Sequence, residues 1–107
     1  MNKEKNLGID EIFNLAFKDH KESKFKSAES NYNKILIEDP NHFNTLYLLG
    51  TLNFQKQKFG EAKKNFEKAI LIKPNHAELC NNWRHINSNG RIYGFNKIFK
   101  KCYQYFT

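Results

Sequence analysis

The chain contains an internal repeat of 34 residues, and this period restricts its possible folds more than any other feature. The segments ILIEDPNHFNTL and ILIKPNHAEL mark the repeat, and Pro40 and Pro74 lie 34 residues apart. The same spacing relates many other positions: Ile12 to Leu46, Leu15 to Leu49, Ala16 to Gly50, Ala28 to Ala62, Tyr32 to Phe66, Ile35 to Ala69 and His42 to His76. One structural unit is therefore expected at least twice.

Each copy is predicted to form two antiparallel helices. The first half carries apolar residues at i, i+3 and i+4, the spacing of one helix face, as in Ile12, Leu15 and Ala16. The second half carries another such stripe and ends before a proline, because the residue preceding a proline disfavours the α conformation. Small residues at Ala16 and Gly50 are expected to let the partner helix approach closely. The predicted helices span residues 9–21, 25–38, 43–56 and 59–72.

These residues resemble the tetratricopeptide repeat, whose signature W-x2-L-G-x2-Y, A-x3-F and P has the same period. The second copy follows it most closely, with LYLLG, Ala62-x3-Phe66 and Pro74, whereas the first copy opens more loosely with IFNLA. The resemblance covers Ile9 to about Asn82. It implies an all-α fold in which antiparallel helix-turn-helix repeats stack as a short right-handed α-solenoid. The implied organisation is an N-terminal tail at 1–8, repeats at 9–42 and 43–76, and a degenerate third repeat or cap at 77–107.

The third copy opens in register and departs from the pattern at Trp83. Arg84 then occupies the column in which the earlier copies carry a small residue. One interpretation is the divergence of a terminal repeat, which can still pack as a cap. The other is out-of-frame translation after Asn82, because tryptophan has a single codon and reading one base later gives glycine. Permitted codons then give GDILILMEEFMDSIKSLKNAINIL, and the chain would be a truncated remnant of a longer array.

The resemblance implies a protein-protein interaction scaffold that binds a peptide or protein segment in the concave groove lined by the first helices. Asn14 and Asn82 occupy equivalent positions, where a carboxamide can donate to and accept from an extended peptide backbone. Leu48 lies between them. Arrays preceding O-linked N-acetylglucosaminyltransferases carry such an asparagine ladder, so an accessory region of a glycosyltransferase-type enzyme is an alternative. The groove residues expected are Phe13, Asn14, Phe17, Tyr47, Leu48, Thr51 and Asn82, with His20, Phe54 and Asn81 as further candidates.

The net charge of +7 is concentrated at the end of the chain. No acidic residue follows Glu78, and the basic residues after it alternate with tyrosine and phenylalanine: Arg84, Arg91, Lys97, Lys100 and Lys101. Basic and aromatic residues together can contact phosphates and stack on bases. Nucleic-acid binding through this tail is therefore the alternative from another class, although the charge begins where the proposed frame change begins.

The sequence contains no motif that predicts catalysis. The four histidines do not form H-E-x-x-H, and neither a glycine-rich phosphate loop nor a nucleophile motif is present. We therefore predict no enzymatic activity, no cofactor and no metal site. No run approaches the roughly 18 apolar residues of a membrane span, and the start lacks the apolar segment of a secretory signal. Cys80 and Cys102 lack CxxC spacing and are interpreted as reduced thiols, so a cytoplasmic location is predicted.

Two sound repeats are few for a solenoid, because each repeat buries its apolar face on a neighbour and at least three are generally needed. Phe66 and Ile70 of the second copy would be exposed unless the residues that follow cover them. The sequence therefore predicts marginal stability, or self-association through the exposed end of the solenoid.

Overall fold

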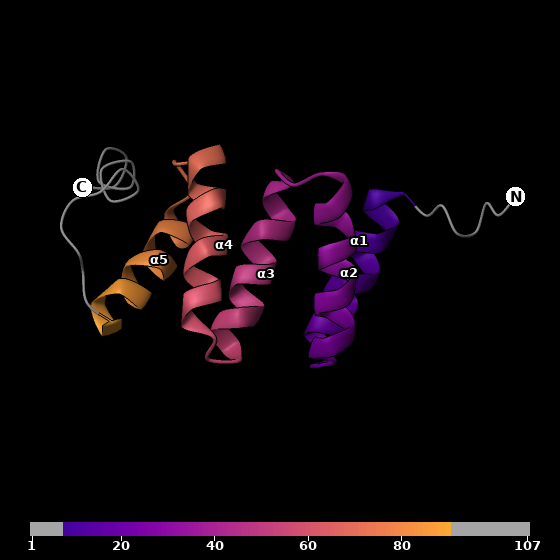
Figure 1. The fold of residues 1–107 in the computed structure, drawn as a ribbon, viewed down its shortest axis with the longest axis horizontal. Helices are drawn as coiled ribbons and strands as arrows, with labels where there is room; N and C mark the ends of the chain where they lie inside the picture. Colours follow the sequence, from indigo (N-terminus) through magenta and orange to yellow (C-terminus); the bar gives the residue numbers. More distant parts are fainter. Residues whose placement is uncertain (1–7, 91–107) are drawn as a thin grey trace, which may run out of the picture.

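The computed structural model describes residues 8–90, with side chains described for residues 8–85, and this part of the chain is helical without strands. Figure 1 shows the helices side by side in a row, with α1 paired to α2, α3 paired to α4, and α5 following α4. The predicted all-α architecture of stacked helix pairs is confirmed. The helices are α1 (Ile9–Lys21), α2 (Phe25–Glu38), α3 (Phe43–Gln55), α4 (Phe59–Ile72) and α5 (Ala77–Gly90).

The turns inside the two repeats are built alike. Ser23 and Gln57 lie at equivalent positions and both have a positive φ, 62° and 63°. After each of them the chain turns back, and Lys24 N and Lys58 N each donate to a carbonyl near the end of the preceding helix at 2.8 Å. The second helix of each repeat therefore starts from the same geometry and packs antiparallel to the first.

The turns between repeats carry histidines that cap the next helix. His42 is the N-cap of α3, and its Nδ1 lies 3.3 Å from the Thr45 amide nitrogen and 2.8 Å from the Thr45 hydroxyl. His76 precedes α5, and its Nδ1 accepts from the amide of Leu79 at 3.2 Å. Each imidazole satisfies a backbone donor that the helix itself leaves unpaired. The matching Pro-Asn-His segments are therefore repeat junctions with a capping function.

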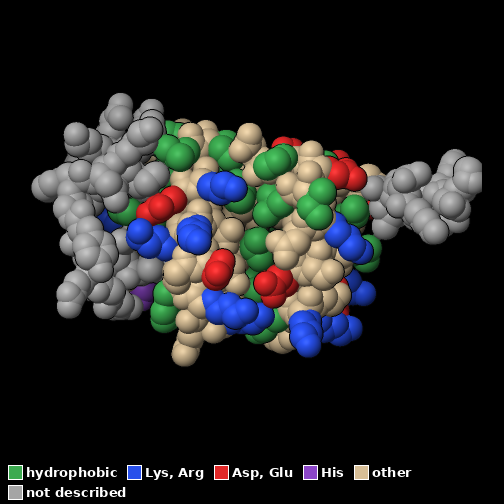
Figure 2. Space-filling model, in the orientation of Figure 1, with side chains coloured by type: hydrophobic (Ala, Val, Ile, Leu, Met, Phe, Trp, Pro, Cys, Tyr) green, Lys and Arg blue, Asp and Glu red, His purple; other side chains and the backbone are tan. Residues whose placement is uncertain are grey.

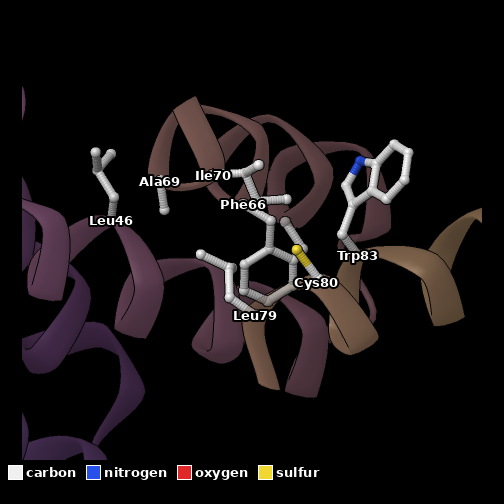
Figure 3. Close-up of a cluster of buried hydrophobic side chains, with 8 residues drawn as sticks. Leu46, Phe66, Ala69, Ile70, Leu79, Cys80 and Trp83 are labelled. Atoms are coloured by element: carbon white, nitrogen blue, oxygen red, sulfur yellow. The ribbon is translucent and has the colours of Figure 1, made fainter. Parts of the chain in front are cut away.

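The apolar core consists of two clusters, one for each end of the row. The first lies between α1, α2 and α3 and contains Ala16, Ala28, Tyr32, Leu49 and Leu52. The second joins α3, α4 and α5, and most of its members are labelled in Figure 3: Leu46, Ala62, Phe66, Ala69, Ile70, Leu79, Cys80 and Trp83. Every residue of both clusters is at most 5 % exposed.

Phe66 and Ile70 are not exposed at the end of the second repeat, because α5 packs against the cluster that contains both side chains. Each is fully buried, and Trp83 of α5 is 2 % exposed within the same cluster. The indole Nε1 of Trp83 donates to a carboxylate oxygen of Glu67 at 3.0 Å. Trp83, at which the repeat pattern fails, is thus a main packing residue of the second cluster. Self-association stays a prediction, and these two side chains no longer support it.

Gly50 shows why one column of the repeat holds small residues. A β-carbon at this position would lie 2.6 Å from Cδ1 and Cε1 of the Phe66 ring. Such a distance is below van der Waals contact, and the buried ring has no free space to move into. The expected close approach of the paired helices is therefore confirmed at Gly50.

The prediction of a reduced thiol is wrong for Cys80, which is disulfide-bonded. The absence of CxxC spacing bears only on pairs that are close in sequence, so it could not exclude this bond. No helix within residues 8–90 is long and apolar enough to cross a membrane. The cytoplasmic location stays a prediction, and the cysteine argument no longer supports it.

The basic aromatic segment at 91–107 lies outside the described residues. Nucleic-acid binding through this segment therefore stays a prediction, as does the cap assigned to 77–107 beyond α5. The frame change after Asn82 and the origin from a longer array also stay predictions.

Candidate peptide-binding face

The seven predicted groove residues lie on α1, α3 and α5, and we call their side chains the first-helix face. The structure brings α1 and α3 into contact. Phe13 of α1 and Leu48 of α3 both pack against the first apolar cluster, so these parts of the face adjoin. Asn82 lies on α5, the next first helix in the row, and is half-buried.

On α1, the face consists of two stacked rings and one exposed carboxamide. The centroids of Phe13 and Phe17 are 6.3 Å apart with the ring planes 13° from parallel. The ring of Phe13 also packs against the rings of Tyr32 and His42, with centroid distances of 6.3 Å and 5.8 Å. Phe17 is 38 % exposed, and Asn14 is exposed beside these rings in the sequence. Among the predicted groove residues of α1, Phe17 and Asn14 are therefore the ones that a partner can reach.

Lys21 brings a positive charge to this part of the face. Its Nζ lies 4.7 Å from the centre of the Phe17 ring, within the range of a cation–π interaction. The ammonium group covers part of the ring and keeps its own contact with water. A ligand that packs on Phe17 can therefore do so with Lys21 either in place or moved aside.

On α3, Tyr47 occupies the position equivalent to Phe13 and repeats its environment. Its ring stacks on Phe43 with centroids 6.2 Å apart and tilts against His76 at 5.0 Å. Burial, followed by a hydrogen bond to Glu78 and the charge of that carboxylate, raises the pKa of Tyr47 to about 12. The phenol therefore remains protonated at neutral pH and donates to Glu78. Tyr47 links the first-helix face to the start of α5.

Leu48 and Thr51 contribute less to a free surface. Leu48 is half-buried and packs on the first cluster, so it interrupts the asparagine ladder with an apolar contact inside the protein. The Thr51 hydroxyl donates to the carbonyl of Tyr47 at 3.0 Å, which leaves its oxygen as an acceptor. The glycosyltransferase-type alternative rests on Asn14 and Asn82 alone and stays a prediction.

The structure places the three further candidates for the groove, His20, Phe54 and Asn81, in different environments. His20 is 8 % exposed and hydrogen-bonded inside the protein, so it does not belong to the accessible face. Phe54 is half-buried between the rings of Phe59 and His85, at 5.4 Å and 5.7 Å. Asn81 is exposed, and its Oδ1 accepts from the guanidinium of Arg84 at 3.1 Å.

Sequence reasoning missed the part that the histidines at 42 and 76 play in this face. Each packs on an aromatic ring in the first helix of its own repeat, Phe13 or Tyr47, while it caps the following helix. Their recurrence at a 34-residue spacing was visible in the sequence. The missing information was that the turn folds back against the first helix of its own repeat.

A cleft of about 330 Å³ lies between α2, α3 and α4 and differs chemically from the first-helix face. Its walls combine acidic, basic and carboxamide side chains, and no aromatic ring lines it. In Figure 2, acidic and basic side chains are interspersed over the visible face. The residues lining the cleft are Glu29, Asn33, Leu36, Leu49, Asn53, Lys58, Glu61 and Asn65.

Within the described residues, no three His, Cys, Asp or Glu side chains are grouped to hold a metal ion.

Comparison with known families supports the class of protein that the fold indicates. Residues 43–76 match the family model described as Tetratricopeptide repeat. This range coincides with the predicted second repeat and contains α3, α4 and the turn that leads to α5. The match supports membership of the tetratricopeptide repeat family, whose repeats generally mediate protein–protein interactions and form scaffolds that are typically not catalytic. No curated protein matches the chain.

Proposed function

We propose that this chain is a protein-interaction scaffold that binds an uncharged, apolar peptide segment along its first-helix face. The observation that carries the proposal is the composition of that face. None of its seven residues is charged, and three of them are aromatic. The rings of Phe13, Phe17 and Tyr47 remain half-buried or exposed after the helices have packed.

The face offers two kinds of contact to such a segment. Phe17 provides apolar area for a side chain of the peptide, and the ring of Phe13 stacks against it. Asn14 is exposed next to it and can donate to and accept from the peptide backbone. Aromatic residues supply much contact area with few rotatable bonds, which favours their use as binding residues.

The proposal is tested with random 12-residue peptides displayed on phage and selected against the full chain. We expect the selected peptides to be rich in aromatic and aliphatic residues without a preferred charge. For a synthetic selected peptide, Phe17→Ala is expected to weaken binding about fivefold to thirtyfold, the loss of a central aromatic contact worth about 1–2 kcal/mol. Fluorescence anisotropy measures the Kd.

Leu71→Ala is the matched control, since Leu71 is 47 % exposed but lies on the second helix of its repeat. It is expected to leave the Kd unchanged within about twofold, as is raising the salt concentration, because contacts between neutral groups are little screened. A charged consensus among the peptides, or equal losses for the two variants, would contradict the proposal.

A further inference from the structure

A hydrogen-bonded chain, buried at Tyr32 and His20 and reaching the surface at Gln55, connects the first repeat to the second. His20 of α1 lies with Nδ1 3.0 Å from the hydroxyl of Tyr32 in α2 and with Nε2 2.7 Å from Oε1 of Gln55 in α3. His20 is 8 % exposed and Tyr32 is fully buried. The three side chains therefore join three helices at the end of α1 that is closest to Phe17 and Lys21.

The chemistry of the partners fixes the direction of both bonds. A carboxamide oxygen can only accept, so Nε2 of His20 carries the hydrogen and donates to Gln55. In a neutral imidazole the other nitrogen is then an acceptor, and it takes the hydroxyl hydrogen of Tyr32. The chain is complete only while His20 is neutral.

We propose that His20 is a positioning residue whose neutral imidazole holds the first repeat against the second, and that its protonation loosens this junction. The consequence for binding rests on the proposed function. Phe17 lies on α1 and Tyr47 on α3, so a loosened junction would alter the distance between the two halves of the first-helix face.

Protonation removes an acceptor that the site cannot replace by a simple rearrangement. A proton from solvent on Nδ1 turns that nitrogen into a donor, and the hydroxyl of Tyr32 must rotate to accept from it. The hydrogen of the hydroxyl would then need a new acceptor beside the fully buried Tyr32 side chain, and an unpaired buried donor costs about 1–3 kcal/mol. Burial also raises the pKa of Tyr32, so the phenol stays protonated and supplies no compensating negative charge.

Three charged groups on or next to these helices are engaged with other side chains. Asp19, adjacent to His20 on α1, accepts from the Ser27 hydroxyl at 2.6 Å. Glu29 of α2 pairs at 3.2 Å with Lys56, the C-cap residue that directly follows Gln55 at the end of α3. On its other side His20 is followed by Lys21, whose ammonium group lies over Phe17.

The second repeat carries apolar residues at the positions equivalent to His20 and Tyr32, and these residues suggest a variant that tests the proposal. Phe54 and Phe66 stand where the first repeat has His20 and Tyr32. The double variant H20F/Y32F therefore introduces the two residue types that the second repeat carries at these positions, and neither of them titrates. The single variant H20Q keeps both a donor and an acceptor without titrating, and serves if the double variant does not fold.

The experiment uses the full chain and amide hydrogen exchange followed by NMR at pH 7.5 and pH 5.0. In the native protein, protection factors corrected for intrinsic exchange are expected to fall about tenfold more in α1 and α2 than in α4. H20F/Y32F and H20Q are expected to abolish that difference. The control H85Q, which removes an exposed histidine of α5, is expected to preserve it.

Two results would overturn the proposal. One is a neutral His20 with the hydrogen on Nδ1, seen in long-range proton–nitrogen correlation spectra at pH 7.5. The other is an unchanged difference between the helices in the non-titrating variants. Because hydrogen exchange needs no peptide, a failure of peptide binding leaves this test intact. If both proposals hold, the affinity for a selected peptide falls at pH 5.0 in the native protein but not in H20Q.

Discussion

The two junctions of this molecule follow the same 34-residue register and both contain an apolar cluster, but they differ in the contacts added to it. The first repeat packs on α3 through the first cluster and is joined to it further by the hydrogen-bonded chain of His20, Tyr32 and Gln55 and by the ion pair of Glu29 with Lys56. The second repeat joins α5 through an apolar cluster in which Trp83 is the largest side chain. The repeat therefore specifies how helices pair within a unit, while the residues that face the next unit vary.

The comparison also explains why the motif fails at Trp83 while the packing does not. Trp83 occupies the column of Leu15 and Leu49, and Leu49 is 5 % exposed against 2 % for Trp83. A larger ring in this column fills space beside Phe66, where the second repeat would otherwise end. A departure from the family signature is thus compatible with a sound interface, because the interface requires apolar volume rather than a particular residue.

The largest effect is expected from removing the main packing residue of the second junction. Trp83→Ala should lower the free energy of unfolding by about 3–5 kcal/mol, because it deletes a large buried ring and leaves a cavity. Urea denaturation followed by circular dichroism measures the change. Leu71→Ala, at a side chain that is 47 % exposed, should cost less than about 1 kcal/mol. A loss below about 1 kcal/mol for Trp83→Ala would show that α5 does not stabilise the second repeat.

A smaller change in stability is expected from replacing either of two glycines in the second repeat by alanine, and it should be a loss at Gly50 and a gain at Gly60. Gly50→Ala would place a methyl group against the buried Phe66 ring and should cost about 1–3 kcal/mol, partly offset by about 1 kcal/mol of helix propensity. Gly60→Ala, where an added Cβ would meet open space, should stabilise the protein by up to about 1 kcal/mol. Thermal unfolding of the two single variants separates the effect of close packing from that of helix propensity. A shift of Tm in the same direction for both variants would contradict the account.

The smallest effect is expected from the ion pair of the first junction. Lys56 and Glu29 are 3.2 Å apart, and their side chains are 24 % and 31 % exposed. A double-mutant cycle with Lys56→Ala and Glu29→Ala should give a coupling free energy of about 0.2–1 kcal/mol that decreases in high salt. A coupling well above that range would mean that the ion pair, and not the hydrogen-bonded chain, dominates this junction.

Most of the fold could be predicted from the sequence, because the period fixes several elements together. Pro40 and Pro74 mark the ends of the second helices, and Ala16 and Gly50 mark the close approach within each pair. These features depend on residues within one repeat. They are therefore readable from local spacing and from the comparison of one copy with the next.

The interactions between repeats could not be predicted in the same way. His20 was expected on the accessible face, but its partner Gln55 comes from the next repeat and Tyr32 from the other helix of its own. Sequence spacing reports helix faces, whereas these bonds depend on which residues the stacked helices bring together.

The central claim, that the uncharged first-helix face is the docking surface, is tested most directly by mapping a selected peptide on the labelled protein with NMR. Titration is predicted to shift the signals of Phe13, Asn14 and Phe17 in α1 together with those of Tyr47 and Thr51 in α3. Signals of Asn33, Glu61 and Asn65, around the cleft between the second helices, are predicted to remain in place. Shifts confined to that cleft, with α1 and α3 unaffected, would contradict the account.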